Sequence, residues 1–429
     1  MQIPFRLFLC FFSMNLYVVS QTVNVGNTTL NVREVINNLS IPWEIKWGPD
    51  GYIWMTERPG IVSRVNVESG EKKVILDIQD LTYSSYTNSE AGLLGFEFHP
   101  SFTSNKILFL VYTYTTSSGQ IKERLVSYNY DETLDKLKNE EILIDNINGW
   151  TTHVGCRILA LDDNTILIST GDAQDQSSSQ NLSELTGKIL RVDVSEDNFG
   201  GIPSDNPDTS SYVYSWGHRN AQGLGLAPNG IVYSSEHGPQ NDDELNILMP
   251  NRNYGWPNVY GFCDAPNETN FCNANDVVEP LVNWTPTIAP SDIIWYDHPS
   301  IPEFQNTLLM TVLKNKMLVK FDFSDDGLSV INQTEYFNNM WGRLRDICVS
   351  PDGRIYLATS GYSWPSQPPN EIIELSNNSY YLNLNETHQK NLSINKIIDV
   401  LGKEILNIKD YRGIHFIIYN DGSSKKKIK

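Results

Sequence analysis

Residues 48–57 read Gly-Pro-Asp-Gly-Tyr-Ile-Trp-Met-Thr-Glu, a tight turn followed at once by β-branched and aromatic residues. A short apolar run precedes the turn, so the stretch predicts a β-hairpin. The same pattern returns five more times, and no long helical periodicity competes with it. The later turns lie at 99–100, 162–164, 228–230, 298–299 and 351–353. Six sheet repeats predict an all-β fold, a six-bladed β-propeller in which each blade contacts only its neighbours.

Length and composition agree with a repeated, folded architecture. The chain has 429 residues. Because a single hydrophobic core stops growing at roughly 250–300 residues, we expect several domains or one domain built from repeats. Apolar residues make up 40% of the sequence and aromatic residues 11%, which excludes a disordered chain. The formal net charge is −19, from 32 basic and 51 acidic residues. A field of that sign repels phosphate backbones, so we expect no nucleic-acid partner.

The first twenty residues predict an export signal. Arg6 is followed by an apolar run over 7–19, which is shorter than the roughly 20 residues that a membrane-spanning helix needs. We therefore expect residues 1–20 to be a cleaved signal peptide. The mature protein would be secreted, to the periplasm, the cell surface or the medium.

The C-terminal end differs in charge from the rest of the chain. Residues 390–429 hold nine Lys and Arg against four Asp and Glu, a net charge of +5. We place a boundary between a propeller domain at 21–376 and a small β module at 377–429. Strands are expected around 399–403 and 413–418, followed by a turn at 420–422 and a closing strand. The alternative is a solvated basic tail.

The cysteines suggest one disulfide. Cys263 and Cys272 flank a polar loop and can pair in an oxidising compartment. Cys156 and Cys348 lie in apolar, strand-like runs and are predicted to be buried thiols. No CxxC spacing typical of a zinc site occurs.

Polar residues recur at two positions of the repeats that should meet at one mouth of the central channel, before each first strand and after each second strand. The preceding residues are Glu90, His153, Arg219, Asn220, Thr287, Arg343 and Arg345. The following residues are Glu57, Asp172, His237, Gly238, Pro239 and Lys314. Taken singly, each has a structural explanation, since a lone histidine is more often a hydrogen-bonded part of the fold. Together they predict a pocket.

The residue types in this pocket indicate an anionic ligand and a hard cation. Arg343 and Arg345 are two residues apart, so they share one face of a strand, and like charges there cost energy unless an anion lies between them. The carbonyls of Gly238 and Pro239 suit calcium, with Asp242 and Asp243 nearby. A polycarboxylate bridged to Ca2+ would satisfy both halves.

At these residues the chain resembles the quinoprotein soluble glucose dehydrogenases and the related aldose sugar dehydrogenases, over about residues 40–375. That family consists of six-bladed propellers that bind pyrroloquinoline quinone (PQQ) and Ca2+. The matching stretches are 41–43, 54–58, 92–100, 171–172, 217–224, 236–246, 253–258, 286–291, 314 and 343–346. Many matches in the same order are specific, although any one alone would be weak.

The resemblance implies a role for each residue. His153 would be the general base toward the anomeric hydroxyl of an aldose, oriented by Asp172, and Arg219 would stabilise the negative charge that develops. Asn220, Thr287, Lys314, Arg343 and Arg345 would bind the cofactor. Glu90, His237 and Tyr254 would line the substrate pocket, and Gly238 and Pro239 would bind Ca2+. An external electron acceptor completes the reaction, and a homodimer is possible.

The resemblance also implies differences and alternatives. The glucose-oxidising enzyme has Gln where this chain has Glu90, which changes the hydrogen bonds offered to a sugar hydroxyl, so we do not expect specificity for glucose. The loops look shorter than in that enzyme, especially between Cys272 and Trp284, so we expect a more open pocket with broad acceptance of aldoses. Residues 390–429 resemble the C-terminal sorting domain of proteins exported by the type IX secretion system. Two alternatives are a non-catalytic extracellular propeller that binds a protein or carbohydrate, and a calcium-dependent sugar-lactone hydrolase. The set of His153, Arg219 and the basic cluster favours the dehydrogenase over both.

Overall fold

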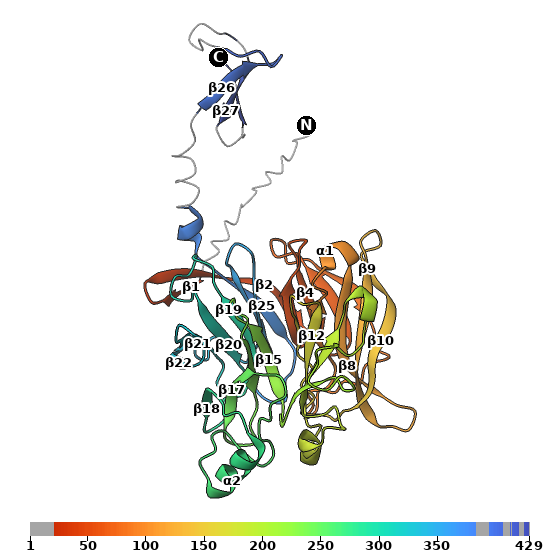
Figure 1. Cartoon of the computed structure of the whole chain (residues 1–429). Coiled ribbons are helices and arrows are strands. Elements are labelled where there is room, and N and C mark those ends of the chain that lie inside the picture. The colour runs from red at the N-terminus through yellow and green to blue at the C-terminus, as the bar shows by residue number, and fades with distance from the viewer. Residues whose placement is uncertain (1–20, 383–393, 406–411, 413, 420–423, 429) are drawn as a thin grey trace, which may run out of the picture. The chain divides into compact units, whose positions relative to one another are not determined.

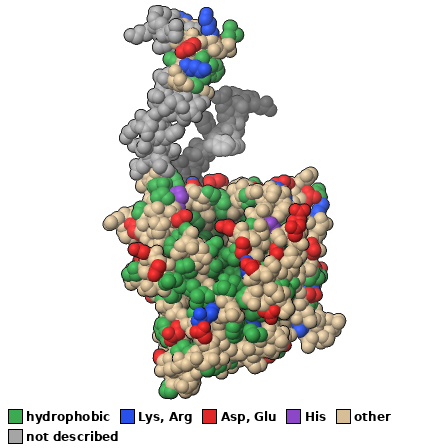
Figure 2. Space-filling view, in the orientation of Figure 1, with side chains coloured by type: hydrophobic (Ala, Val, Ile, Leu, Met, Phe, Trp, Pro, Cys, Tyr) green, Lys and Arg blue, Asp and Glu red, His purple; other side chains and the backbone are tan. Residues whose placement is uncertain are grey.

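The computed structural model describes residues 21–382, 394–405, 412, 414–419 and 424–428, and divides the chain into two compact units, 1–376 and 377–429. Figure 1 shows the strands of the first unit grouped into twisted sheets. Figure 2 shows Asp and Glu side chains scattered over the face in view, as the net charge of −19 leads one to expect. The predicted signal peptide lies outside the described residues. No helix in the described part of the chain has the length and apolar character to cross a membrane.

The described part of the first unit forms six antiparallel sheets, each containing one of the predicted repeats. Five sheets have four strands, and the sixth has five. The first two sheets are β3 (Pro42–Trp47), β4 (Ile53–Glu57), β5 (Ile61–Val65) and β6 (Lys72–Asp77); then β7 (Leu93–Phe98), β8 (Ile107–Thr115), β9 (Ile121–Asp131) and β10 (Lys136–Asn148). The third and fourth are β11 (Ile158–Ala160), β12 (Thr165–Thr170), β13 (Lys188–Asp193) and β14 (Val213–Trp216); then β15 (Ala221–Leu226), β16 (Val232–Glu236), β17 (Asp243–Leu248) and β18 (Val282–Trp284).

The last two sheets complete the set. The fifth is β19 (Pro290–Tyr296), β20 (Thr307–Val312), β21 (Met317–Phe323) and β22 (Val330–Tyr336), and the sixth contains β23 (Leu344–Val349), β24 (Ile355–Thr359) and β25 (Asn370–Ser376). The helical segments of this unit are short: α1 (Phe102–Asn105), α2 (Pro266–Asn275) and 3-10 turns at Gln176–Gln180 and Glu196–Asn198. All six predicted turns connect the first and second strands of a sheet, so the hairpin predictions are confirmed.

The first hairpin shows why these turns form. The Gly51 N–H donates to the Gly48 carbonyl (3.0 Å), and Gly51 has φ +79°, a left-handed conformation that glycine adopts without steric cost. The Asp50 carboxylate accepts from the indole N–H of Trp54 (3.1 Å). The turn thereby sets the pairing of Trp47 with Ile53 and places the fully buried Trp54 in the core.

The first strands of the six sheets, called the inner strands below, contact one another in turn. β3 contacts β7, β7 contacts β11, and the series continues through β15, β19 and β23, which contacts β3 again. The N-terminal strands β1 (Gln21–Val25) and β2 (Thr28–Leu39) join the sixth sheet, because β2 pairs with β25. The chain therefore links its start to the last repeat by backbone hydrogen bonds, which the repeat pattern does not predict.

A buried guanidinium links the inner strands. Arg157, with 1% of its side chain exposed, lies directly before β11. It bonds Asp346 on β23 (2.7 Å), Glu44 on β3 (3.2 Å) and Asp292 on β19 (3.5 Å). It also donates to the carbonyl of Gln222 on β15 (2.9 Å) and lies over the ring of Trp43.

The cysteine predictions are confirmed. Cys263 and Cys272 form a disulfide that joins the segment before α2 to a residue within the helix, and Cys156 and Cys348 are buried free thiols. Burial raises the pKa of both thiols well above the ordinary value, so neither is a reactive thiolate.

The second unit contains a three-stranded sheet of β26 (Ile394–Asp399), β27 (Ile414–Tyr419) and β28 (Ser424–Ile428). The strand predicted around 399–403 was placed wrongly. Asp399 ends β26, and its carboxylate accepts from the amides of Leu401 (2.8 Å) and Lys403 (2.9 Å), which closes a turn instead. The predicted turn at 420–422 lies outside the described residues.

The Arg157 network generates a stability prediction. Arg157→Leu should lower the free energy of unfolding by about 3–5 kcal/mol, because it leaves buried carboxylates without their cation. Lys138→Ala is the control, since Lys138 forms an ion pair with Asp131 in which its side chain is 43% exposed, and exposed pairs contribute about 0–1 kcal/mol. Urea unfolding of both variants is the measurement, and similar losses would contradict a central role for Arg157.

Candidate functional site

The inner strands carry the predicted site residues to a cavity of about 450 Å3. Three of the predicted cations, Lys314, Arg343 and Arg345, line it together with Glu90 and His237. A further cation, Lys316, also lines it, as do the aromatic residues Tyr362 and Trp364, both substantially exposed. This cavity, called the cation cavity below, brings together residues from four different repeats, as the sequence predicts.

His153 is held in an unusual backbone conformation at the edge of this region. Its φ is +56°, a left-handed value that costs energy for a non-glycine residue and is found preferentially at functional sites. Its N–H donates to the Glu90 carboxylate (2.9 Å), and its carbonyl accepts from the amide of Ala173 (3.0 Å). A Cβ on Gly171 would come within 1.9 Å of that carbonyl, so only glycine lets the 171–173 loop approach.

The hydrogen bonds of the His153 ring define its tautomer. Nδ1 lies 2.8 Å from an Asp172 oxygen, and Nε2 lies 3.0 Å from Nη2 of Arg219. A guanidinium can only donate, so Nε2 accepts and Nδ1 carries the proton that Asp172 binds. The Nε2 lone pair is therefore directed at Arg219.

Asp172 is positioned to act on His153 and not on solvent. It is fully buried, and its second oxygen accepts from the indole N–H of Trp256 (2.9 Å). The amide of Gln174 donates to the same oxygen that binds His153 (2.9 Å). These bonds fix the carboxylate in the orientation that holds the imidazole ring.

Arg219 and Asn220 are fixed by a carboxylate that the sequence analysis did not single out. Glu236 accepts from the backbone amides of both residues, and its other oxygen bonds Nδ1 of His218 (2.9 Å). Arg219 donates Nη1 to the carbonyl of His237 (3.0 Å). Burial lowers the pKa of the Arg219 guanidinium, although the charges of Asp172 and Glu90 oppose this effect.

Arg343 and Arg345 carry positive charge that the protein does not neutralise. They are 7% and 4% exposed, and neither forms an ion pair within the described residues. Arg345 donates to Gln222 (2.7 Å) and Ser291 (3.2 Å), both uncharged. Burial and the like charges of Arg157 and Arg343 lower the pKa of Arg345 to about 9. Burial lowers the pKa of Arg343 to about 10.

Glu90 is the carboxylate that lines the cation cavity, and it forms hydrogen bonds with more than one partner. Besides the His153 amide it accepts a long hydrogen bond from Asn220 (3.4 Å). Burial alone would raise the pKa of Glu90, but its electrostatic interactions with His153, His237 and Arg345 and the bond from the His153 amide lower it. Glu90 is therefore ionised, and one carboxylate faces several cations.

Thr287 and His237 are placed at the cavity by short contacts. Lys314 donates Nζ to the Thr287 hydroxyl (2.8 Å), which joins two predicted cofactor residues. The His237 ring bonds the carbonyl of Pro290 through Nε2 (2.7 Å), and burial lowers its pKa. Asn220 is fully buried, and its oxygen accepts from the Gly155 amide (3.0 Å), so its contacts are mostly with the protein.

The predicted metal residues lie in a small adjacent cavity. Gly238 and Pro239 line it together with Arg219, Glu236 and Tyr254. Tyr254 does not line the cation cavity, because its ring stacks on His218 and its hydroxyl bonds the carbonyl of Ile247 (2.6 Å). Across the ranges that the structure describes, no group of three or more His, Cys, Asp or Glu side chains is arranged to hold a metal.

The two aspartates expected near the metal have structural roles. Asp243 accepts from the amides of Gly238 (2.7 Å), Ile288 (2.6 Å) and Ala289 (2.7 Å). Asp242 accepts from Asn283 and Thr285 (2.7 Å each). These carboxylates position the loop that presents the Gly238 and Pro239 carbonyls, and backbone oxygens remain the available ligands.

Two further residues differ from the sequence analysis. Glu57, expected at the mouth, bonds the Ser40 amide (2.7 Å) and forms an ion pair with Lys72. The next residue, Arg58, directly after β4, is buried as well and interacts electrostatically with Glu90, while burial lowers its pKa to about 10. Arg58, and not Glu57, is therefore the residue at this strand end that acts on a group lining the cation cavity.

The fold and the site together define an all-β protein whose six sheets contact one another in a ring, with His153 bonded to a carboxylate of a cation-lined cavity. Residues 39–363 match the family model for glucose and sorbosone dehydrogenases, which covers most of the chain. The chain therefore belongs to the glucose/sorbosone dehydrogenase family.

Individual relatives agree with the family. The quinoprotein glucose dehydrogenase B of Acinetobacter calcoaceticus is 27% identical over 418 residues, covering 78% of this chain and 86% of that protein. The aldose sugar dehydrogenase YliI of Escherichia coli is 24% identical, covering 81% and 95%. The solved PQQ-bound aldose sugar dehydrogenase of Streptomyces coelicolor has a TM-score of 0.68 at 27% identity, covering 80% and 97%.

The Asp243 contacts lead to a prediction about the loop. Asp243→Ala should lower the free energy of unfolding by about 3–5 kcal/mol, since three backbone amides lose their acceptor and each such loss costs about 1–3 kcal/mol. Asp208→Ala is the matched control, because that carboxylate bonds only its own exposed turn. Chemical denaturation measures both, and equal effects would show that Asp243 does not hold the loop.

Proposed function

We propose that the six sheets are the blades of one propeller whose channel mouth oxidises aldoses at the anomeric carbon, using PQQ and Ca2+. The observation that carries the proposal is the pairing of His153, whose ring is oriented by Asp172 and contacts Arg219 through Nε2, with a neighbouring cavity lined by arginines that form no ion pair in the described part of the chain. Hydride removal from a sugar requires a base and a redox cofactor. His153 would be the base, and the cation cavity would bind an anionic cofactor.

The cation cavity fits a tricarboxylate quinone. The Nε atoms of Arg343 and Arg345 are buried and have no acceptor in the described part of the chain. Buried polar groups without partners cost stability unless a ligand satisfies them. Arg343, Arg345 and Lys314 would bind the carboxylates of the cofactor, and Thr287 would add a hydrogen bond. Trp364 lies near Arg343 and adds an aromatic surface.

The proposed calcium site offers fewer protein ligands than a calcium ion needs. The carbonyls of Gly238 and Pro239 would supply two oxygens, and a hard cation needs about 6–8. The remaining ligands would come from water and from the anionic cofactor, because the nearby carboxylates of Asp243 and Glu236 are occupied by protein amides. Calcium would add positive charge next to the cofactor.

In the proposed reaction, each of these residues would have a separate role. The C–H electrons leave the anomeric carbon as hydride, the hydroxyl proton goes to His153 Nε2, and the C=O bond of the lactone forms. Asp172 keeps the proton on Nδ1 and stabilises the imidazolium that results. For Nε2 to take this proton, Arg219 would give up its hydrogen bond to Nε2, and it would then stabilise the negative charge that develops at the mouth. Bound quinone supplies the two-electron acceptor.

A non-catalytic binding propeller is less well supported. Such a protein has no need for a histidine oriented by a buried carboxylate, or for arginines buried without counter-charge at a cost in stability. A lactone hydrolase likewise gives the basic cluster no role. Secretion, homodimer formation and a sorting role for residues 377–429 remain predictions from the sequence.

Reconstitution tests the reaction. Purified protein supplied with PQQ and Ca2+ should reduce an artificial electron acceptor when aldoses are added. His153→Ala should lower kcat by about 10²–10⁴-fold while still binding PQQ, and Asp172→Asn should lower kcat without changing cofactor affinity. No reduction with any aldose would exclude the proposed function.

Glu90 gives a second test, on cofactor affinity. Glu90→Gln should tighten PQQ binding about tenfold, which corresponds to about 1.4 kcal/mol, because the Glu90 charge competes with the cofactor for Arg343 and Arg345. Arg343→Ala should weaken binding by at least as much. Glu132→Gln, on an exposed side chain, is the control, and titration of the apoprotein measures affinity. Weaker binding by Glu90→Gln would show that its bond to the His153 amide dominates.

A further inference from the structure

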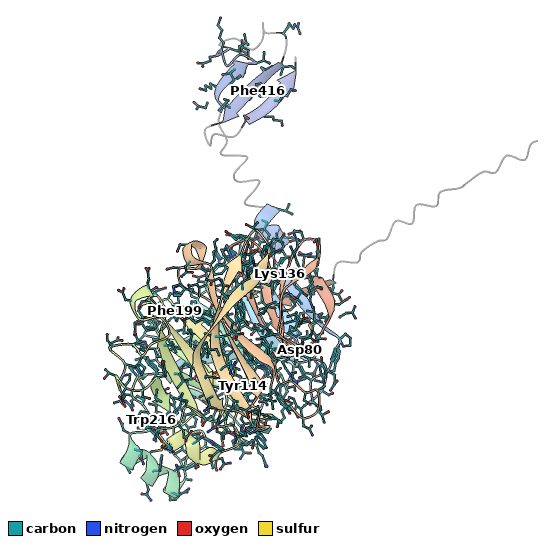
Figure 3. All side chains as sticks on the ribbon, turned by 90° about the vertical axis from the view of Figure 1, so that its right-hand side faces the viewer. Asp80, Tyr114, Lys136, Phe199, Trp216 and Phe416 are labelled. Carbon is teal, nitrogen blue, oxygen red and sulfur yellow. A yellow bond between two sulfur atoms is a disulfide. The ribbon has the colours of Figure 1, made fainter. Side chains whose placement is uncertain are left out.

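A second cavity, of about 430 Å3, lies beside His153 and is not used by the proposed reaction. The loop between β8 and β9 and the end of β10 form one wall, through Gln120, Lys122, Asn148 and Trp150. The segment that follows β12 forms the other wall, through residues 172–175. In Figure 3, Tyr114, one of the last residues of β8, lies toward the same side of the first unit as Trp216.

The cavity is tied directly to the catalytic base. Ala173, in its wall, donates its amide to the His153 carbonyl (3.0 Å), and Gln174 bonds the hydroxyl of Thr152 (2.9 Å). Trp150 precedes His153 by three residues, so their Cα atoms lie within about 11 Å of each other. A ligand that reacts at His153 and extends by one more ring can reach Trp150.

Trp150 offers an aromatic surface to this cavity. The residue is 52% exposed, although a tryptophan normally buries most of its surface. The apolar face of a pyranose ring packs against an aromatic ring, and its hydroxyls bond polar side chains at the edge. An exposed indole in a concave, polar-edged site therefore suits a sugar ring.

The polar groups of the cavity are already ordered by contacts within the protein. Lys122 donates to Asn148 (2.6 Å), which in turn donates to Glu184 (3.3 Å). Asp175 is held by the amide (3.2 Å) and hydroxyl (2.6 Å) of Ser177. The lining contains one cation, Lys122, and two carboxylates, Asp172 and Asp175, in contrast to the cation cavity. This excess of negative charge favours a neutral, hydroxyl-rich ligand over a phosphate or a second quinone.

We propose that this cavity is a subsite for the second sugar ring of a reducing disaccharide or longer oligosaccharide, with Trp150 as its platform. The proposal rests on the proposed function for the place of the reducing-end ring, which lies at His153. The ring attached to it extends away from the anomeric carbon and occupies the space between Trp150 and residues 172–175. The preferred substrates are then reducing oligosaccharides, and monosaccharides leave this subsite empty.

Binding without turnover tests the subsite independently of the reaction. Methyl maltoside and methyl cellobioside have no free anomeric hydroxyl and cannot be oxidised there. In calorimetric titration of the full chain, at least one should bind, Trp150→Ala should weaken that binding at least tenfold, and Trp150→Phe should retain most of it. Ile331→Ala, on β22 with 70% of the residue exposed, is the control and should bind as the wild type does. Equal affinity in wild type and Trp150→Ala, or no binding of either glycoside, would overturn the proposal.

Kinetics of the reconstituted enzyme separate failure of the subsite from failure of the proposed function. The ratio of kcat/KM for maltose or cellobiose over that for glucose should fall about tenfold in Trp150→Ala and stay unchanged in Ile331→Ala. Oxidation of glucose with an unchanged ratio would overturn the subsite and leave the proposed function intact. Glycoside binding that depends on Trp150, without oxidation of any aldose, would support the subsite and exclude the reaction.

Discussion

The Arg157 guanidinium is the interaction on which the ring of sheets depends. Five inner strands meet at it: it precedes β11 and reaches β3, β15, β19 and β23. The Glu44 carboxylate also accepts from the Phe96 amide on β7 (2.8 Å), which joins the sixth inner strand. Taking such charges out of water is expensive, and only several simultaneous partners compensate for it. The network therefore specifies which strands face the centre, in addition to what it adds to stability.

The same network reaches the proposed site through two short connections. Asp346, which binds Arg157, is the neighbour in sequence of Arg345, so β23 supplies the network and the cation cavity from adjacent residues. Gln222 offers its backbone carbonyl to Arg157 and its side-chain oxygen to Arg345 (2.7 Å), and its amide donates to Asn220 (3.1 Å). Arg345 is thus held in place by uncharged groups, which leaves its charge available to a ligand. A preorganised cation of this kind needs no rearrangement when an anion binds.

The sequence was sufficient to predict the hairpins and that several polar residues of different repeats gather at one cavity, because both follow from short-range rules. Turn residues mark where each hairpin reverses, and residues at equivalent ends of repeats meet in space. The predictions were less successful where side-chain direction decides. Arg58 and not Glu57 faces Glu90, and Tyr254 points to the backbone of Ile247. The addition of β2 to the last sheet and the role of Arg157 depend on contacts between distant segments, for which no local pattern exists.

The distribution of charge gives the site its selectivity for ligands. An overall charge of −19 repels anions at long range, but salt screens that repulsion beyond roughly 8–10 Å, so buried cations at the mouth decide what binds. The charge of Glu90 offsets part of the positive charge of Arg343 and Arg345, which form no ion pair in the described residues. The lining of the Trp150 cavity, by contrast, contains two carboxylates and one cation. On the proposed function, a polyanion would bind at the arginines and a neutral polyol would bind in the Trp150 cavity.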